Sequence, residues 1–230
     1  MDGVNIRSFL TQTYPLFGFI GSLLMIFAMF TTGIFYRGKQ GERYSVLNHY
    51  ISELGEIGVS KLAWLFNAGL ILGGLFLLPF MVGFGLELNS LWAKLGMVVG
   101  VWAALSVMAV GVLPMNHLKA HSFVAMSYFR SGLVTVLLFS VAVFIQPAGQ
   151  QVISKASNIA GLISLLCYAT FLLTSDAPRK DREEGASANA LDPEAEKVRP
   201  RFWRVTILEW AVFFSTILWF LIIAVYRFMA

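Results

Sequence analysis

The sequence has few of the residues that mark soluble, disulfide-bonded or nucleotide-binding proteins. Cys167 is its one cysteine in 230 residues, which excludes an intramolecular disulfide and an all-cysteine metal site. Only 13% of the residues are charged, whereas 57% are hydrophobic, far from the averages of soluble domains. A phosphate-binding glycine loop, a nucleophile elbow and a haem attachment motif are all missing. The low charge and high hydrophobicity indicate a membrane protein, and the missing motifs leave its cofactor unidentified.

Hydrophobic runs long enough to cross a bilayer, about 20 residues each, occur near residues 15–36, 61–86, 92–114, 121–146, 154–174 and 205–229. The runs lack the alternation of polar and apolar residues that is typical of barrel strands. Their backbone groups can therefore make all their hydrogen bonds in lipid only as helices. We therefore predict an all-α fold: a polytopic integral membrane bundle of six transmembrane helices that forms a single domain over residues 1–230. Gly69 with Gly73, and Gly96 with Gly100, predict close helix packing within the chain more than dimerisation.

Basic residues are distributed unevenly between the two sets of loops. The first set carries twelve: Arg37, Lys39, Arg43, Lys61, Lys119, Arg179, Lys180, Arg182, Lys197, Arg199, Arg201 and Arg204. The second set carries four: Arg7, Lys94, Lys155 and Arg227. Because cytoplasmic loops are enriched in Lys and Arg, we predict a multi-pass protein of the cell membrane with both termini outside. The net charge of +4 then reflects topology, and we expect no nucleic-acid partner.

Residues 176–201, between the fifth and sixth predicted helices, mix both charge signs with Ala, Ser, Gly and Pro. Such a segment cannot bury enough apolar surface to fold alone. We predict a flexible cytoplasmic linker. Its basic end either docks a membrane-protein partner or anionic headgroups, or serves only to set the topology.

The stretch "YSVLNHYISELGEIGVS", residues 44–60, is polar for its position between two apolar runs. On a helical projection its polar and apolar residues separate onto opposite sides. We therefore predict a short interfacial amphipathic helix of about three turns, with its apolar side against lipid or the bundle. The apolar side holds Leu47, Tyr50, Ile51, Leu54 and Ile57, and the polar side holds His49, Ser52, Glu53 and Glu56.

All three histidines of the chain fall on the predicted cytoplasmic side: His49, His117 and His121. His117 and His121 have the i, i+4 spacing of one helix face, and imidazole with a carboxylate such as Glu53 suits zinc or another divalent metal. These three are the metal-ligand candidates. The alternative is that each histidine only makes hydrogen bonds.

Polar groups inside the predicted spans require partners. Arg130 follows His121 by nine residues, so it should point to the opposite side of a straight helix. Glu209, about one turn inside the last span, is its predicted acidic partner. Asn67 in the second span is predicted to make an interhelical hydrogen bond.

The motifs "HYISELG" at 49–55, "LFNAGLILGG" at 65–74 and "GVLP" followed by Asn116 and His121 resemble the membrane family called domain of unknown function 998. More loosely, they are similar to the Frag1, damage-regulated autophagy modulator and Sfk1 superfamily. By position the resemblance covers Ser52, Glu53, Gly55, Asn67 and His121. It implies six spans and, for some superfamily members, a link to the organisation or remodelling of lipids.

Three functional hypotheses follow. The first is a protein that binds or modifies a membrane lipid at a cytoplasmic-side site, with Ser52, Glu53 and His121 as catalytic candidates if there is a reaction. The other candidate residues for that site are His49, Asn67, Asn116, Arg130 and Glu209. The second hypothesis is a non-catalytic scaffold or accessory subunit, in which the same groups fix the short helix to the bundle. The third is a metal-dependent intramembrane hydrolase, by analogy with the alkaline ceramidases, which have seven spans.

The charge distribution gives a test of topology. Single cysteines introduced at Ser45 and Ser187 should resist an impermeant thiol reagent added to intact cells and should react after permeabilisation. Labelling of either position from outside would show that the predicted orientation is wrong.

Overall fold

The computed structural model describes residues 5–149, 151–175 and 200–229. Within these ranges six helices are long and apolar enough to cross a membrane. They are α1 (Ile6–Phe35), α2 (Ala63–Leu88), α3 (Leu91–Val112), α4 (Leu118–Phe144), α5 (Asn158–Ser175) and α7 (Arg204–Met229). Three 3₁₀ turns accompany them: η1 (Ile51–Gly55), η2 (Met115–His117) and η3 (Lys155–Ser157). The predicted all-helical six-span bundle is confirmed, and most of the predicted linker, 176–199, lies outside the described residues.

The first helix begins earlier than its hydrophobic run, at Ile6 in place of residue 15. Asn5 caps it by accepting a hydrogen bond from the backbone of Arg7, and the hydroxyls of Thr11 and Thr13 bond back to helix carbonyls. The first turns of α1 are thus helical although they lie outside the apolar segment that hydropathy detects.

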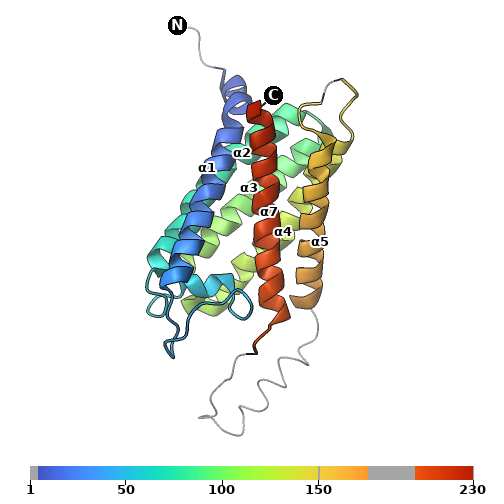
Figure 1. Ribbon diagram of the computed structural model, residues 1–230. Coiled ribbons are helices and arrows are strands. Elements are labelled where there is room, and N and C mark those ends of the chain that lie inside the picture. The colour runs from blue at the N-terminus through green and yellow to red at the C-terminus, as the bar shows by residue number, and fades with distance from the viewer. Residues whose placement is uncertain (1–4, 150, 176–199, 230) are drawn as a thin grey trace.

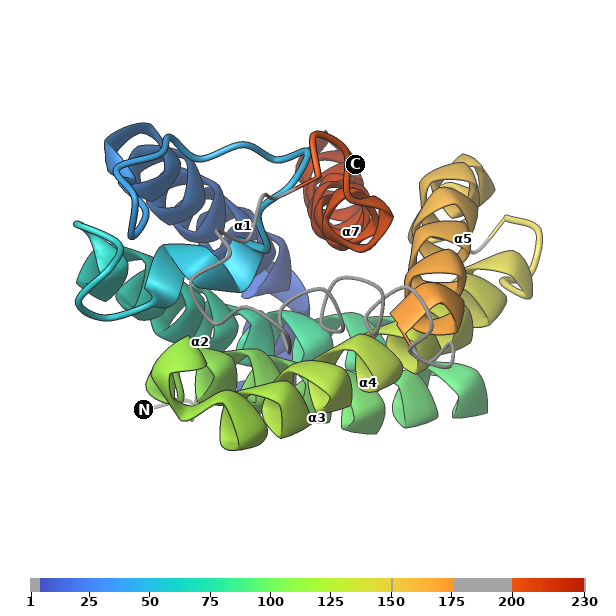
Figure 2. The ribbon, with the colours of Figure 1, turned by 90° about the horizontal axis from the view of Figure 1, so that it is seen from below.

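The six helices form a ring in chain order. Each packs on the next, and α7 closes the ring by packing on both α5 and α1 (Figures 1 and 2). The connections α1–α2 and α3–α4 lie at one end of the bundle, and the two described termini lie at the other (Figure 1). The first end carries every predicted site residue except Arg130, so we call it the site end.

Glycines allow the neighbouring helices of the ring to approach closely. A Cβ on Gly69 would lie 2.2 Å from the Cβ of Ala28 in α1, and one on Gly100 would lie 2.7 Å from the sulfur of Met81 in α2. The small residues of the second and third spans thus face other helices of the same chain, as their spacing predicts.

Gly83 gives a test of this packing, because an added Cβ would lie 2.5 Å from the carbonyl oxygen of Leu10 and 2.4 Å from the Cβ of Tyr14. Gly83→Ala should lower the free energy of unfolding in detergent by about 1–3 kcal/mol, the usual cost of overpacking, measured as a fall in thermal midpoint. Gly33→Ala is the matched control, since its Cβ would approach only Tyr44, at 3.9 Å. Equal midpoints for the two variants would contradict the proposed close approach.

Candidate functional site at the η1 end of the bundle

The chain between α1 and α2 folds over the site end of the ring, and we call residues 44–62 the cap segment. It contains one five-residue 3₁₀ helix, η1, flanked by turns, where the sequence predicts three turns of amphipathic helix. Figure 2 shows it as the cyan ribbon lying beside α1 and α2. Gly58 adopts a φ of +86°, which ends the local structure in a turn that favours glycine.

The predicted faces of this segment are right for Ile51 and Leu54, which are buried, and wrong for His49, Glu53 and Ile57. His49 and Glu53 are 2% and 4% exposed, whereas Ile57, assigned to the apolar face, is 61% exposed. The reason is that polar side chains turn inward to satisfy backbone groups that an irregular segment leaves unpaired. Periodicity of hydrophobicity cannot detect this requirement.

Two carboxylates accept hydrogen bonds from consecutive backbone amides at the start of η1. The Oε1 of Glu53 accepts from the N–H of Tyr50 at 2.9 Å, and the Oε2 of Glu209 accepts from the N–H of Ile51, also at 2.9 Å. Glu209 is 8% exposed and comes from α7, 158 residues away in sequence. It therefore binds the cap segment to the last helix. Its predicted partner, Arg130, is exposed on α4, whereas Glu209 is buried.

Two asparagines attach the rest of η1 and the turn after it. The Nδ2 of Asn67 in α2 donates to the carbonyl of Gly55 at 3.1 Å. Asn116, in η2, accepts from the N–H of Ile57 and donates to its carbonyl, each at 2.9 Å. Gly55 is required by this contact, because a Cβ there would lie 2.4 Å from the Oδ1 of Asn67. The predicted interhelical bond of Asn67 is thus made to the cap segment.

Aromatic residues complete the attachment, and sequence reasoning missed them. The Tyr44 hydroxyl donates to the carbonyl of Tyr50 at 2.9 Å and accepts from the indole N–H of Trp210 at 3.1 Å. Burial, and then the negative charge of Glu209, raise the pKa of Tyr44, so this phenol keeps its proton. His49 packs edge-on against Tyr36, with ring centroids 5.6 Å apart. The signal available in the sequence was Trp210, an indole beside the one acid of α7.

A cavity of about 60 Å³ lies beneath the cap segment, inside the ring. A cavity needs roughly 10–15 Å³ for each water molecule, so there is room for several. Ser52, His121 and Glu209 meet at it with the ring of Tyr128. Its remaining lining is apolar and comes from η1 and from all the ring helices except α5: Met25, Met29, Ile51, Phe66, Leu70, Val107, Val110, Ala125, Phe129, Val212 and Phe213.

A second cavity of about 30 Å³ lies deeper in the bundle and shares Met25, Val107, Tyr128 and Phe213 with the first. Hydroxyl groups in its lining bond to other hydroxyl groups. Tyr168 donates to Tyr128 at 3.5 Å, and Thr216 pairs with Ser164 at 3.1 Å. The polar groups of the first cavity therefore sit at the outer end of a mainly apolar interior.

The chemistry of the cavity is limited by what His121 contacts. Its Nδ1 lies 2.7 Å from the carbonyl oxygen of Leu113, which only accepts, so Nδ1 carries the proton and Nε2 is the acceptor of the neutral ring. Ser52 and His121 line the same cavity but make no hydrogen bond to each other in the described structure. The nucleophile and base arrangement of a hydrolase is thus not formed here.

The three histidines do not form a cluster. His49 is buried among the rings of the cap segment, His121 lines the cavity, and His117 is exposed at the start of α4. Within the described ranges, no three His, Cys, Asp or Glu side chains are grouped so as to hold a metal ion. The donor set therefore does not fit the zinc site suggested by histidine spacing.

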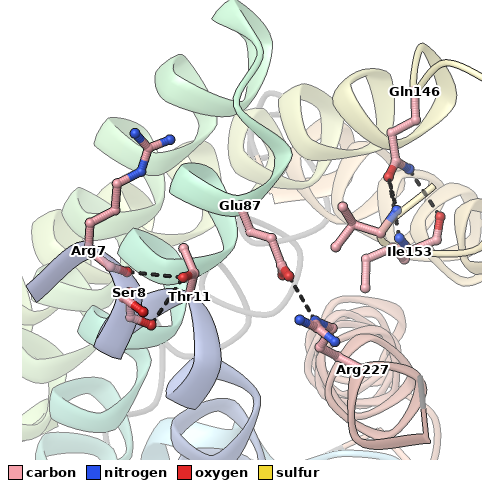
Figure 3. Close-up of polar contacts among 8 residues, drawn as sticks. Arg7, Ser8, Thr11, Glu87, Gln146, Ile153 and Arg227 are labelled. Atoms are coloured by element: carbon pink, nitrogen blue, oxygen red, sulfur yellow. Dashed lines mark hydrogen bonds and ion pairs between the residues drawn. The ribbon is translucent and has the colours of Figure 1, made fainter. Parts of the chain in front are cut away.

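The opposite end of the bundle has a polar contact of its own. Figure 3 shows Glu87 at the end of α2 reaching Arg227 at the end of α7, with 2.8 Å between Oε1 and Nε. Gln146 organises the nearby α4–α5 loop by bonding to the backbone of Ile153 and Val152 (Figure 3). Helix α7 is therefore tied to other elements at both of its ends.

A family model described as protein of unknown function (DUF998) matches residues 19–226. The chain belongs to this family. No curated protein and no solved structure matches it at a significant level. Membership confirms the resemblance carried by the cap segment, Asn67 and His121, whereas the looser similarity to the Frag1 superfamily stays a prediction.

Glu209 gives a test of the attachment. Glu209→Leu should leave the N–H of Ile51 buried without an acceptor and lower the free energy of unfolding by about 1–3 kcal/mol, seen as a lower thermal midpoint and faster trypsin cleavage after Lys61. Glu209→Gln keeps an acceptor oxygen, so its free energy of unfolding should fall by less. Identical behaviour of the two variants would contradict the assigned hydrogen bond.

Proposed function

We propose that this protein binds a membrane lipid, with part of the lipid in the cavity beneath the cap segment and its polar end beside Ser52, His121 and Glu209. The observation that carries the proposal is the position of Glu209, which both holds the cap segment through Ile51 and lines the cavity. An apolar cavity with a few convergent polar groups is the usual form of a small-molecule site.

The composition of the lining favours a lipid over a polar solute. Apart from Ser52, His121, Glu209 and the Tyr128 hydroxyl, the residues around the cavity are aliphatic, aromatic or methionine. Aliphatic chains gain about 0.8 kcal/mol for each CH₂ group buried, and lipid chains surround the bundle. The deeper cavity extends the apolar space away from the polar end.

The site end is cytoplasmic in this proposal, because the loops at that end carry the larger number of basic residues. The linker of 176–201 is on the same side and supplies the proposed docking segment for a membrane-protein partner. The contact of His121 with Leu113 favours lipid binding without a reaction. His121, the candidate base, is not directed to Ser52 by a hydrogen bond.

A scaffold function is the second candidate, and a different set of contacts favours it. Glu53, Asn67 and Asn116 are each hydrogen-bonded to the backbone of the cap segment. These residues fix the segment to the bundle as a structural attachment would. Under this alternative the cavity holds no specific ligand, which distinguishes the two candidates.

Ala125 lines the cavity, and Ala120 lies five residues before it on the exposed surface of the same helix. Ala125→Phe should fill the cavity and remove a lipid that copurifies with the wild-type protein in mild detergent, measured by native mass spectrometry. Ala120→Phe adds the same ring outside and should keep that lipid. The lipid-binding proposal fails if both variants retain the same bound species as the wild type.

A further inference from the structure

The charges around the cavity restrict the class of lipid that it accepts. We infer that the ligand is a lipid whose polar end is a hydroxyl or an amine and carries no phosphate. This inference rests on the proposed function and deepens it, because it concerns what the same cavity recognises.

The cavity offers no lysine or arginine among its lining residues. His121 lines the cavity as a neutral ring, whose one proton is on Nδ1 and directed to the carbonyl of Leu113. Glu209 at the same place supplies carboxyl oxygens and no positive charge, and the buried Glu53 lies beside it on the next amide of η1. An anion taken from water into this site would lose its hydration without a paired charge, which is strongly unfavourable.

Basic residues occur at the same end of the bundle, but outside the cavity. Arg37, Lys61, Lys119 and Arg204 are all exposed. A phosphate headgroup would therefore find its partners on the surface of the bundle, and the interior would be left to a different polar end. The separation of surface cations from interior acceptors is what distinguishes the two binding modes.

The interior groups match a hydrogen-bond donor. The Nε2 of His121 is an acceptor in the neutral ring, and Glu209 uses one carboxylate oxygen for Ile51 and has a second. Ser52 can both donate and accept. A hydroxyl or an amine supplies protons to such a set, and an amine in addition pairs its charge with the carboxylate.

Three lipids with one chain in common test the inference: oleyl alcohol, oleylamine and oleyl phosphate. Each is added to the full-length protein in a neutral detergent, and binding is measured by native mass spectrometry and by the shift in thermal midpoint. The alcohol and the amine should bind the wild type and Ala120→Phe but not Ala125→Phe. Oleyl phosphate should bind all three proteins equally, as expected for a surface contact.

Glu209→Gln separates the alcohol from the amine. It keeps an acceptor for Ile51 but removes the carboxyl group that an ammonium ion would pair with. It should therefore weaken binding of the amine by about tenfold or more and binding of the alcohol by less. Val110→Phe, which also fills the cavity, replaces Ala125→Phe if that variant folds poorly.

The outcomes distinguish the two levels of the argument. If oleyl phosphate binds in a manner that Ala125→Phe and Val110→Phe abolish, the inferred class is overturned while lipid binding in the cavity stands. If none of the three lipids depends on the cavity, the proposed function itself is overturned and the scaffold alternative is favoured.

Discussion

The hydrogen bond from the N–H of Ile51 to the carboxylate of Glu209 is the contact on which the site end depends. Backbone amides away from water must find acceptors, and the cap segment has too little regular structure to supply its own. One acid on the last helix meets that need, and its neighbour Trp210 holds the Tyr44 hydroxyl of the same segment. The cavity owes its polar end to this arrangement, because the carboxylate that holds the cap is also part of the lining.

The same helix is held by a second carboxylate at its far end, where Glu87 meets Arg227. Between these two points α7 packs against α1 and α5 and contributes Val212, Phe213 and Thr216 to the two cavities. Packing in a bilayer gains little from the hydrophobic effect between helices. Polar contacts at both ends therefore do much to keep α7 in place beside an interior that is not completely filled.

The sequence predicted the parts of the structure that depend on composition and could not predict those that depend on contacts distant in sequence. Six apolar runs were enough to predict six helices, and the small residues at 69 and 100 were enough to predict close packing within the chain. The cap segment has a clear helical projection, yet His49 and Glu53 are buried because they satisfy local backbone and ring contacts. Glu209 was recognised as an acid needing a partner, but that partner is a backbone amide, which no side-chain pattern reveals. Of the residues assigned to the site, His121, Ser52 and Glu209 do come together, whereas His117 and Arg130 lie on the surface.

The order of the helices around the ring has a consequence for biosynthesis. Since each helix packs on the one before it, the first five can associate as they leave the ribosome, but the ring stays open until α7 arrives. Until then the amide of Ile51 has no carboxylate and the cavity has no wall on that side. A nascent chain that ends before Glu209 would thus expose the unfinished interior to the bilayer.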